Sequence, residues 1–209
     1  MRLGRALVTT IAAAIAMLTA APASAQHDEP STPRDGEVLL LMRTDVGDLH
    51  LAVDTVRAPI TAGNFLRYVD RGLYTGGTFY RAVRPDNQPN DEVKIEVVQG
   101  GMDRARGEQA LPPIPMEGTN VSGIRHIDGT LSMARGGPNS GRAEFFITIG
   151  DQPSLDEGGK RNPDGLGFAA FGRVVQGMDV VRAIQAAPTD GQYLTTRIGI
   201  LFVERVAAH

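Results

Sequence analysis

The sequence predicts a mainly β domain, an antiparallel barrel or sandwich accompanied by two α-helices. Short runs of β-favouring residues recur along most of the chain, separated by clusters of Gly, Pro, Asn and Asp. Only two stretches carry apolar residues at helical spacing. A doubly wound parallel sheet would need a helix after nearly every strand, so the pattern excludes that class.

The first 25 residues differ in composition from the rest. Arg2 and Arg5 precede an apolar, alanine-rich run of about 16 residues, and Ala23-Ser24-Ala25 then provides small residues at the spacing of a cleavage site. This pattern predicts a signal peptide over residues 1–25. Because the run is shorter than the roughly 20 residues of a membrane-spanning helix, an uncleaved N-terminal anchor is the less favoured alternative. We therefore expect a periplasmic or secreted protein.

Charge and cysteine content exclude several function classes for the processed chain. Arg2 and Arg5 are the only charged residues in the signal peptide, so its removal moves the formal net charge from −3 to −5. A mildly acidic chain has no electrostatic reason to bind nucleic acid or an anionic membrane. The sequence contains no cysteine, which excludes disulfides and a thiol nucleophile. The processed chain of about 180 residues must then be stabilised by one hydrophobic core.

Residues 26–36 are polar, without an apolar side chain, and predict a disordered lead-in. The folded domain is expected over residues 37–209, with its strands and helices in the following order. Residues 37–43 and 49–54 predict a hairpin around the turn residues 44–48. A helix is expected from Pro59 to just before Gly72, and a second one from Met178 to Ala186. The remaining strands are predicted at 78–83, 94–99, 129–135, 144–149, 168–175 and 196–206.

Three polar or aromatic side chains lie at unexpected positions in these strands. In the strand 144–149, period two places Phe145 on the core face and puts Phe146 on the other face, between Glu144 and a threonine. An outward phenylalanine either packs under a loop or receives an apolar ligand. Arg81 interrupts the strand 78–83, where most arginines are solvated or paired, and Gln99 precedes two glycines.

At these residues the chain resembles the cyclophilin family of peptidyl-prolyl cis/trans isomerases, from about residue 37 to residue 206. Four ordered segments carry the resemblance: TFYRAV, VVQGG, LSMARGGPNSGRAEFFI and FAAFGRVVQGMDVV. The resemblance implies a closed antiparallel β-barrel with two flanking α-helices. It also implies catalysed rotation of X-Pro bonds in proline-containing polypeptides by a monomer, without cofactor or metal.

The resemblance also assigns site residues by position. Arg81 corresponds to the catalytic arginine, Gln99 to the active-site glutamine and Phe146 to the floor of the proline pocket. The other residues expected to bind substrate are Phe79, Met133, Ala134, Arg135, Gly136, Glu144, Leu155 and Phe168. Among them, Ala134 to Gly136 match the segment that pairs with the substrate backbone.

Four residues depart from the common family pattern. An insertion after Arg81 puts Glu96 where an aromatic wall residue is usual, Glu144 replaces a glutamine, and Phe168 replaces a histidine. Ser154 stands where tryptophan is common, a residue that the family associates with tight cyclosporin binding. These departures could change the substrate range.

Two other functions compete with this interpretation. A non-catalytic module that binds proline segments as a chaperone or scaffold would need Phe146 and Met133 but no guanidinium, so Arg81 argues against it. A hydrolase is disfavoured because Ser132 lies outside a G-x-S-x-G elbow and the four histidines have no metal-ligand spacing.

Overall fold

The computed structural model describes residues 33–206, and the predicted signal peptide lies outside this range. Nine strands form one antiparallel sheet in the order β1-β2-β7-β5-β6-β4-β3-β9-β8. Strand β1 (Glu37–Thr44) also pairs with β9 (Tyr193–Arg205), so eight strands close into a barrel and β8 (Thr189–Asp190) extends it as a hairpin. The predicted closed antiparallel barrel is confirmed.

The strands lie close to the predicted positions. After β1, the other ring members are β2 (Gly47–Asp54), β3 (Thr78–Val83), β4 (Val97–Gly101), β5 (Thr130–Met133), β6 (Phe145–Thr148) and β7 (Ala169–Gln176). The β1–β2 turn is tighter than predicted because the Thr44 hydroxyl donates to the Gly47 carbonyl at 2.7 Å and accepts from the Val46 amide at 3.2 Å. Gly47 is required there, since an added Cβ would lie 2.7 Å from the Val180 side chain.

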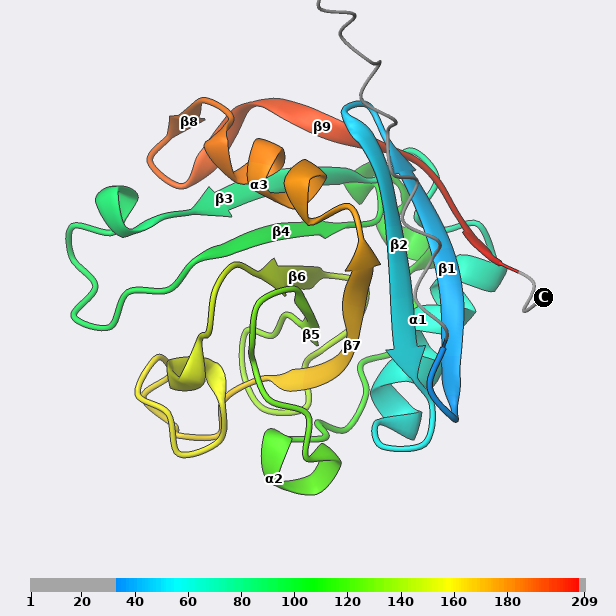
Figure 1. Cartoon of the computed structure of the whole chain (residues 1–209), viewed down its shortest axis with the longest axis horizontal. Helices are drawn as coiled ribbons and strands as arrows, with labels where there is room; N and C mark the ends of the chain where they lie inside the picture. The colour runs from blue at the N-terminus through cyan, green and yellow to red at the C-terminus, as the bar shows by residue number, and fades with distance from the viewer. Residues whose placement is uncertain (1–32, 207–209) are drawn as a thin grey trace, which may run out of the picture.

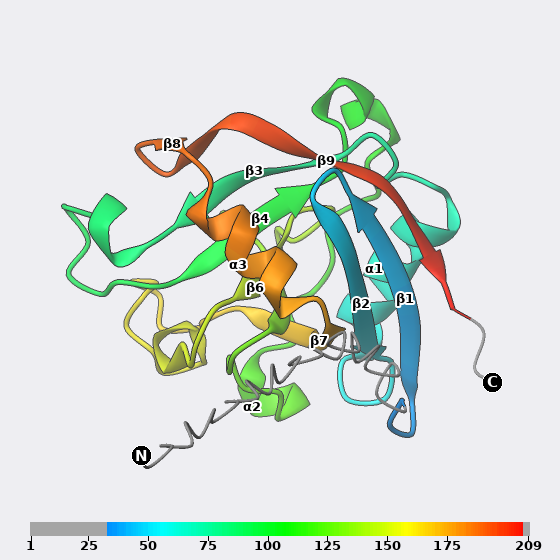
Figure 2. The ribbon, with the colours of Figure 1, turned by 45° about the horizontal axis from the view of Figure 1, so that its top comes forward.

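Two main helices flank the barrel, as predicted. Helix α1 (Pro59–Asp70) begins with proline at its first turn and packs against β2, β7 and β9, whereas α3 (Met178–Ala186) packs against β2, β3 and β4. Figure 1 shows the barrel with its labelled strands, and in Figure 2 α3 lies across the near side of the barrel while α1 lies behind β1 and β2. Within residues 33–206, no helix is long and apolar enough to cross a membrane.

Several short helical segments were not predicted. They are α2 (Thr119–Ser122) and the 3₁₀ turns η1 (Pro85–Asn87), η2 (Arg104–Gln109) and η3 (Pro153–Leu155). Each lies in a long connection, where one helical turn leaves no amphipathic repeat in the sequence. The end of the predicted lead-in forms a turn, in which the Glu37 amide donates to the Arg34 carbonyl at 2.9 Å. The rest of that segment, residues 26–32, lies outside the described residues.

Apolar side chains gather in two separate clusters. The larger one fills the barrel and includes Phe65, Phe145 and Phe171. The smaller one consists of Val83, Ile95, Val97, Phe146 and Leu155, with Ala134 and Phe168 packed against it. Because Phe145 and Phe146 point to opposite faces of β6, this one strand contributes to both clusters. The smaller cluster therefore marks a second apolar region on the outside of the barrel.

Candidate active site

A cavity of about 120 Å³ opens at the smaller cluster, where β3, β4 and β6 lie side by side. Its apolar lining comes from Ile95, Val97, Ala134, Phe146, Leu155 and Phe168, and its polar lining from Arg81, Gln99 and Arg135. Such a volume exceeds that of a single water site and suits a small apolar ring. The structure thus brings together most of the predicted site residues.

Arg81 is half-buried at the edge of this cavity, and two neutral amides hold its guanidinium group. Its Nη1 donates to Gln99 Oε1 at 2.8 Å and its Nε donates to Gln192 Oε1 at 3.0 Å, while Nη2 also donates to Gln192. Burial lowers the pKa of Arg81, yet a guanidinium stays charged at any physiological pH. The result is a fixed positive charge, with no hydrogen-bonded carboxylate, beside an apolar cavity.

Phe146 forms the floor of the cavity and is itself held by two rings. Phe168 meets it edge to face, with ring centroids 5.1 Å apart, and the His126 ring lies parallel behind it at 6.0 Å. Both contacts have geometries that aromatic pairs prefer. Phe168 therefore acts as a wall of the cavity, as the sequence predicts for this position.

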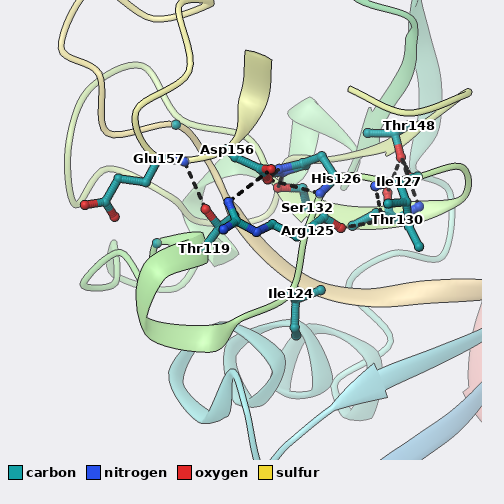
Figure 3. Close-up of polar contacts among 12 residues, drawn as sticks. Thr119, Ile124, Arg125, His126, Ile127, Thr130, Ser132, Thr148, Asp156 and Glu157 are labelled. Atoms are coloured by element: carbon teal, nitrogen blue, oxygen red, sulfur yellow. Dashed lines mark hydrogen bonds and ion pairs between the residues drawn. The ribbon is translucent and has the colours of Figure 1, made fainter. Parts of the chain in front are cut away.

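The His126 ring behind the floor belongs to a buried hydrogen-bond network, which Figure 3 shows. His126 Nδ1 lies 2.8 Å from Asp156 Oδ1, and His126 Nε2 lies 2.9 Å from Ser132 Oγ. Because a carboxylate accepts hydrogen bonds, Nδ1 carries a proton, and in the neutral ring Nε2 then accepts from Ser132. The same Asp156 oxygen also accepts the His126 backbone N–H at 3.1 Å. Burial lowers the pKa of His126, and the hydrogen bond to Asp156 opposes that shift.

The Asp156–His126–Ser132 order resembles that of a hydrolytic triad, but its placement excludes that role. The Ser132 side chain and the His126 ring are both fully buried, so no external carbonyl can reach the hydroxyl. The network is not predictable from the sequence, because His126 precedes β5 in a loop without a recognisable motif. In the described structure the network holds the His126 ring against Phe146.

The insertion after Arg81 rebuilds a wall of the cavity. Ile95 and Val97 line it, whereas Glu96 points away and accepts a hydrogen bond from Gln185 Nε2 at 3.0 Å. Its two neighbours therefore provide the wall at which the common family pattern has an aromatic residue in place of Glu96. Period-two alternation of Ile95, Val97 and Gln99 is visible in the sequence and could have identified both residues.

Phe79 does not line the cavity, contrary to the prediction. It is fully buried in the barrel and packs edge to face on Phe145 at 5.7 Å. Strict period-two alternation would put Phe79 and Arg81 on the same face of β3. A register shift between them, present in the pairing of β3 with both β4 and β9, breaks that alternation.

Met133 also lies apart from the cavity. It is buried and borders a small neighbouring void with Ile114, Arg135 and Ala169. Gly136 and Glu144 line an adjacent groove of about 310 Å³, which shares Gln99, Ala134 and Arg135 with the cavity. Apart from Phe79 and Met133, the predicted residues thus divide between the cavity and this groove.

Arg135 holds a loop in place as well as lining the cavity. Its Nη1 and Nη2 donate to the two carboxylate oxygens of Asp164 at 2.7 and 2.9 Å, and its Nε donates to the Gly167 carbonyl at 2.8 Å. The guanidinium also lies 5.3 Å from the centroid of Phe168. The side chain is therefore occupied by internal contacts, which fix Phe168 against the cavity.

The arrangement has the parts needed to bind an apolar ring and to donate a hydrogen bond to an atom beside it. Among residues 33–206, no group of three or more His, Cys, Asp or Glu side chains is placed to hold a metal ion. The chemistry available to these side chains is electrostatic: a fixed N–H donor stabilises electron density that develops on a bound molecule.

Comparisons with known proteins agree with this geometry. Residues 39–204 match the family model described as cyclophilin type peptidyl-prolyl cis-trans isomerase/CLD. Peptidyl-prolyl cis-trans isomerase A of Dickeya dadantii (strain 3937) is 35% identical over 153 residues, which cover 72% of this chain and 73% of that protein. Isomerase B of Escherichia coli (strain K12) is 31% identical, over 72% of this chain and 86% of that protein.

The fold also resembles a solved structure of low sequence identity. A crystal structure of a cyclophilin type isomerase from Cryptosporidium parvum superposes with a TM-score of 0.66 at 20% identity, covering 83% of this chain and 99% of that one. A second structure of that protein, determined in the presence of the dipeptide Ala-Pro, gives a TM-score of 0.65.

Proposed function

Because the chain belongs to the cyclophilin family of peptidyl-prolyl cis-trans isomerases, we propose that it rotates X-Pro bonds in exported polypeptides and thereby assists their folding. The observation that carries this proposal is Arg81, held by Gln99 and Gln192 at the edge of an apolar cavity. A cavity for the proline ring and a donor for the prolyl nitrogen are the two features that this reaction needs.

The barrier to the reaction is amide resonance. Rotation about a peptide bond costs about 18 to 20 kcal/mol, and uncatalysed X-Pro isomerisation takes tens to hundreds of seconds. At the twisted transition state the prolyl nitrogen regains its lone pair and the carbonyl loses polarity. An apolar site favours this less polar amide over the planar ground state.

Four of the cavity residues have direct roles in this mechanism. Phe146, Leu155 and Ile95 hold the proline ring. An N–H of Arg81 donates to the nitrogen lone pair, which exists only near the transition state, so the contact is stronger there than in the ground state. No covalent bond to the enzyme forms at any step.

The segment from Ala134 to Gly136 is proposed to bind the substrate backbone. Its outer amides are already used inside the protein, since Ala134 N–H donates to the Glu144 carbonyl at 2.9 Å and Gly136 N–H donates to Ser140 Oγ at 3.0 Å. The Arg135 main chain and the carbonyls of the segment are therefore the groups assigned to the substrate.

A test of turnover distinguishes this function from passive binding of proline segments. We expect a substoichiometric amount of the protein to accelerate cis/trans exchange of a neutral Ala-Pro peptide, measured by NMR exchange spectroscopy. Binding of the peptide without faster exchange would support the non-catalytic module instead.

The proposal that the protein is exported rests on the sequence of residues 1–25 and is tested by a separate experiment. We expect protein recovered from an exporting bacterial host to have lost the segment up to Ala25, as measured by intact mass. A mass that retains Met1 to Ala25 would contradict the proposed periplasmic or secreted location.

A further inference from the structure

A chain of hydrogen bonds leads from Arg81 away from the cavity to Glu144. Arg81 Nη1 donates to Gln99 Oε1 at 2.8 Å, Gln99 Nε2 donates to the Tyr80 hydroxyl at 2.7 Å, and that hydroxyl donates to Glu144 Oε2. The four side chains come from two adjacent strands, β3 and β4, and from the residue that precedes β6. The proposed mechanism uses Arg81 and Gln99 but assigns no role to Tyr80 or Glu144.

The carboxyl group of Glu144 lies in a space that a glycine creates. A Cβ added to Gly101 would lie 2.7 Å from Glu144 Oε2 and 2.9 Å from Oε1. Any side chain at position 101 would push the carboxyl group away from Tyr80. The second glycine of the VVQGG segment therefore permits this contact.

Each hydrogen bond in this series is donated in the direction of Glu144, and the negative charge of Glu144 fixes that direction. A carboxylate only accepts, so the single hydroxyl proton of Tyr80 is committed to it and the Tyr80 oxygen can only accept from Gln99. Gln99 must then present its NH₂ group to Tyr80 and its carbonyl to Arg81. The opposite amide orientation would place NH₂ against the guanidinium, two donors facing each other.

We propose that Glu144, acting through Tyr80, sets the amide orientation of Gln99 and so holds Arg81 in its position for catalysis. This inference rests on the isomerase function proposed above. Glu144 and Tyr80 are positioning residues in this scheme, since they act on the guanidinium through Gln99.

Protonation of Glu144 removes the constraint. A neutral carboxyl group can donate to the Tyr80 oxygen, which frees the tyrosine proton to bond with Gln99 Oε1. Only the guanidinium of Arg81 then opposes a 180° rotation of the Gln99 amide. In molecules whose amide has rotated, Arg81 loses the acceptor at Nη1 and keeps only Gln192. Activity should therefore fall as the pH drops through the pKa of Glu144.

The surroundings of Glu144 shift this transition to a higher pH than that of an ordinary glutamate. Burial raises the pKa of Glu144 above its ordinary value, whereas the hydrogen bond from Tyr80 and the charge of Arg104 lower it. Burial and the same hydrogen bond raise the pKa of Tyr80, so the hydroxyl keeps its proton. The ionisable groups near the carboxyl group are Tyr74, Tyr80, Asp103, Arg104, Arg135 and Arg142.

The experiment compares the wild type with Tyr80→Phe, Glu144→Gln and the double variant. For each, kcat and KM for a neutral proline peptide are measured by NMR exchange from pH 4 to pH 8. We expect the wild type to show an acid decline in kcat with an apparent pKa above the ordinary glutamate value of 4.5. Each variant should lose that decline, with a kcat at neutral pH about three- to tenfold lower and a nearly unchanged KM.

The double variant and two controls sharpen the test. Because both residues act through one chain, the double variant should be no slower than the slower single variant. Glu204→Gln removes an exposed carboxylate on β9, and Tyr68→Phe removes a buried hydroxyl that accepts from the Leu111 amide at 2.8 Å. Both controls should keep the acid decline.

The outcomes that overturn the inference differ from those that overturn the function. An acid decline that persists in Glu144→Gln or Tyr80→Phe, or additive losses in the double variant, would overturn the positioning role while leaving the isomerase intact. A wild type without an acid decline would overturn it as well. A wild type without turnover would overturn the proposed function and, with it, this inference.

Discussion

The hydrogen-bond partners of the Arg81 guanidinium are neutral amides, and this determines how strongly its positive charge acts on a bound substrate. A carboxylate partner would cancel part of the positive charge, whereas Gln99 and Gln192 orient the fork of N–H groups without doing so. A lysine at this position would present one mobile ammonium in place of the planar fork. The sequence predicts Arg81 and Gln99, but Gln192 lies 111 positions away from Arg81 and only the β8–β9 turn brings it near.

Ser154 leads to a prediction about cyclosporin. A tryptophan at this rim position would offer a large apolar surface and an N–H donor, and such a residue contributes about 2 kcal/mol or more at a binding hot spot. Serine provides neither. We expect an active enzyme that cyclosporin inhibits only weakly, and Ser154→Trp should tighten inhibition in the same assay. Stoichiometric inhibition of the wild type at nanomolar drug would show that other residues replace the tryptophan.

At the scale of elements, alternation predicts the strands well and fails where the register shifts. The opposite faces of Phe145 and Phe146 follow directly from period two and are confirmed. Phe79 was misplaced because the shift beside it in β3 has no signature in the sequence. The His126 network was not predicted for a related reason, since Asp156 is 30 positions away and only tertiary packing brings the two residues together.

Two loops meet at the rim of the cavity through Arg161. Its Nη1 donates to the Val93 carbonyl at 2.7 Å and its Nη2 lies 3.2 Å from Asp91 Oδ2, so it joins the loop after η3 to the insertion before β4. Two residues that line the cavity lie next to this contact: Ile95 belongs to the insertion, and Leu155 is the last residue of η3, directly before the loop that carries Arg161. The Arg161 side chain is only 14% exposed, which favours a fixed contact.

We therefore expect Arg161→Ala to loosen the proline pocket. The variant should raise KM for a proline peptide about threefold or more and change kcat by less than about twofold, because Arg81 keeps its own partners. Arg182→Ala is the matched control, since it removes an exposed ion pair with Asp128 away from the cavity. An equal KM in Arg161→Ala and the wild type would show that the two loops hold the pocket without this contact.

At the scale of the whole molecule, the barrel and the site are separable. The eight-stranded ring closes around the larger apolar cluster, and the groups proposed for catalysis lie outside it, beside the smaller cluster. Strands β3, β4 and β6 contribute side chains to both faces, in strict alternation along β4 and β6 and with a register shift in β3. Substitutions on the outer face of these strands should therefore alter activity while the barrel core retains its packing.

This separation allows a direct test of the claim that Arg81 carries the catalysis. We expect Arg81→Ala to lower kcat/KM for a proline peptide at least about tenfold, equivalent to roughly 1.4 kcal/mol of transition-state stabilisation, with an unchanged circular dichroism spectrum. Arg205→Ala, which removes an exposed ion pair with Asp70 on the far part of β9, is the control and should retain the wild-type rate. A folded Arg81→Ala variant that turns over at the wild-type rate would contradict the account.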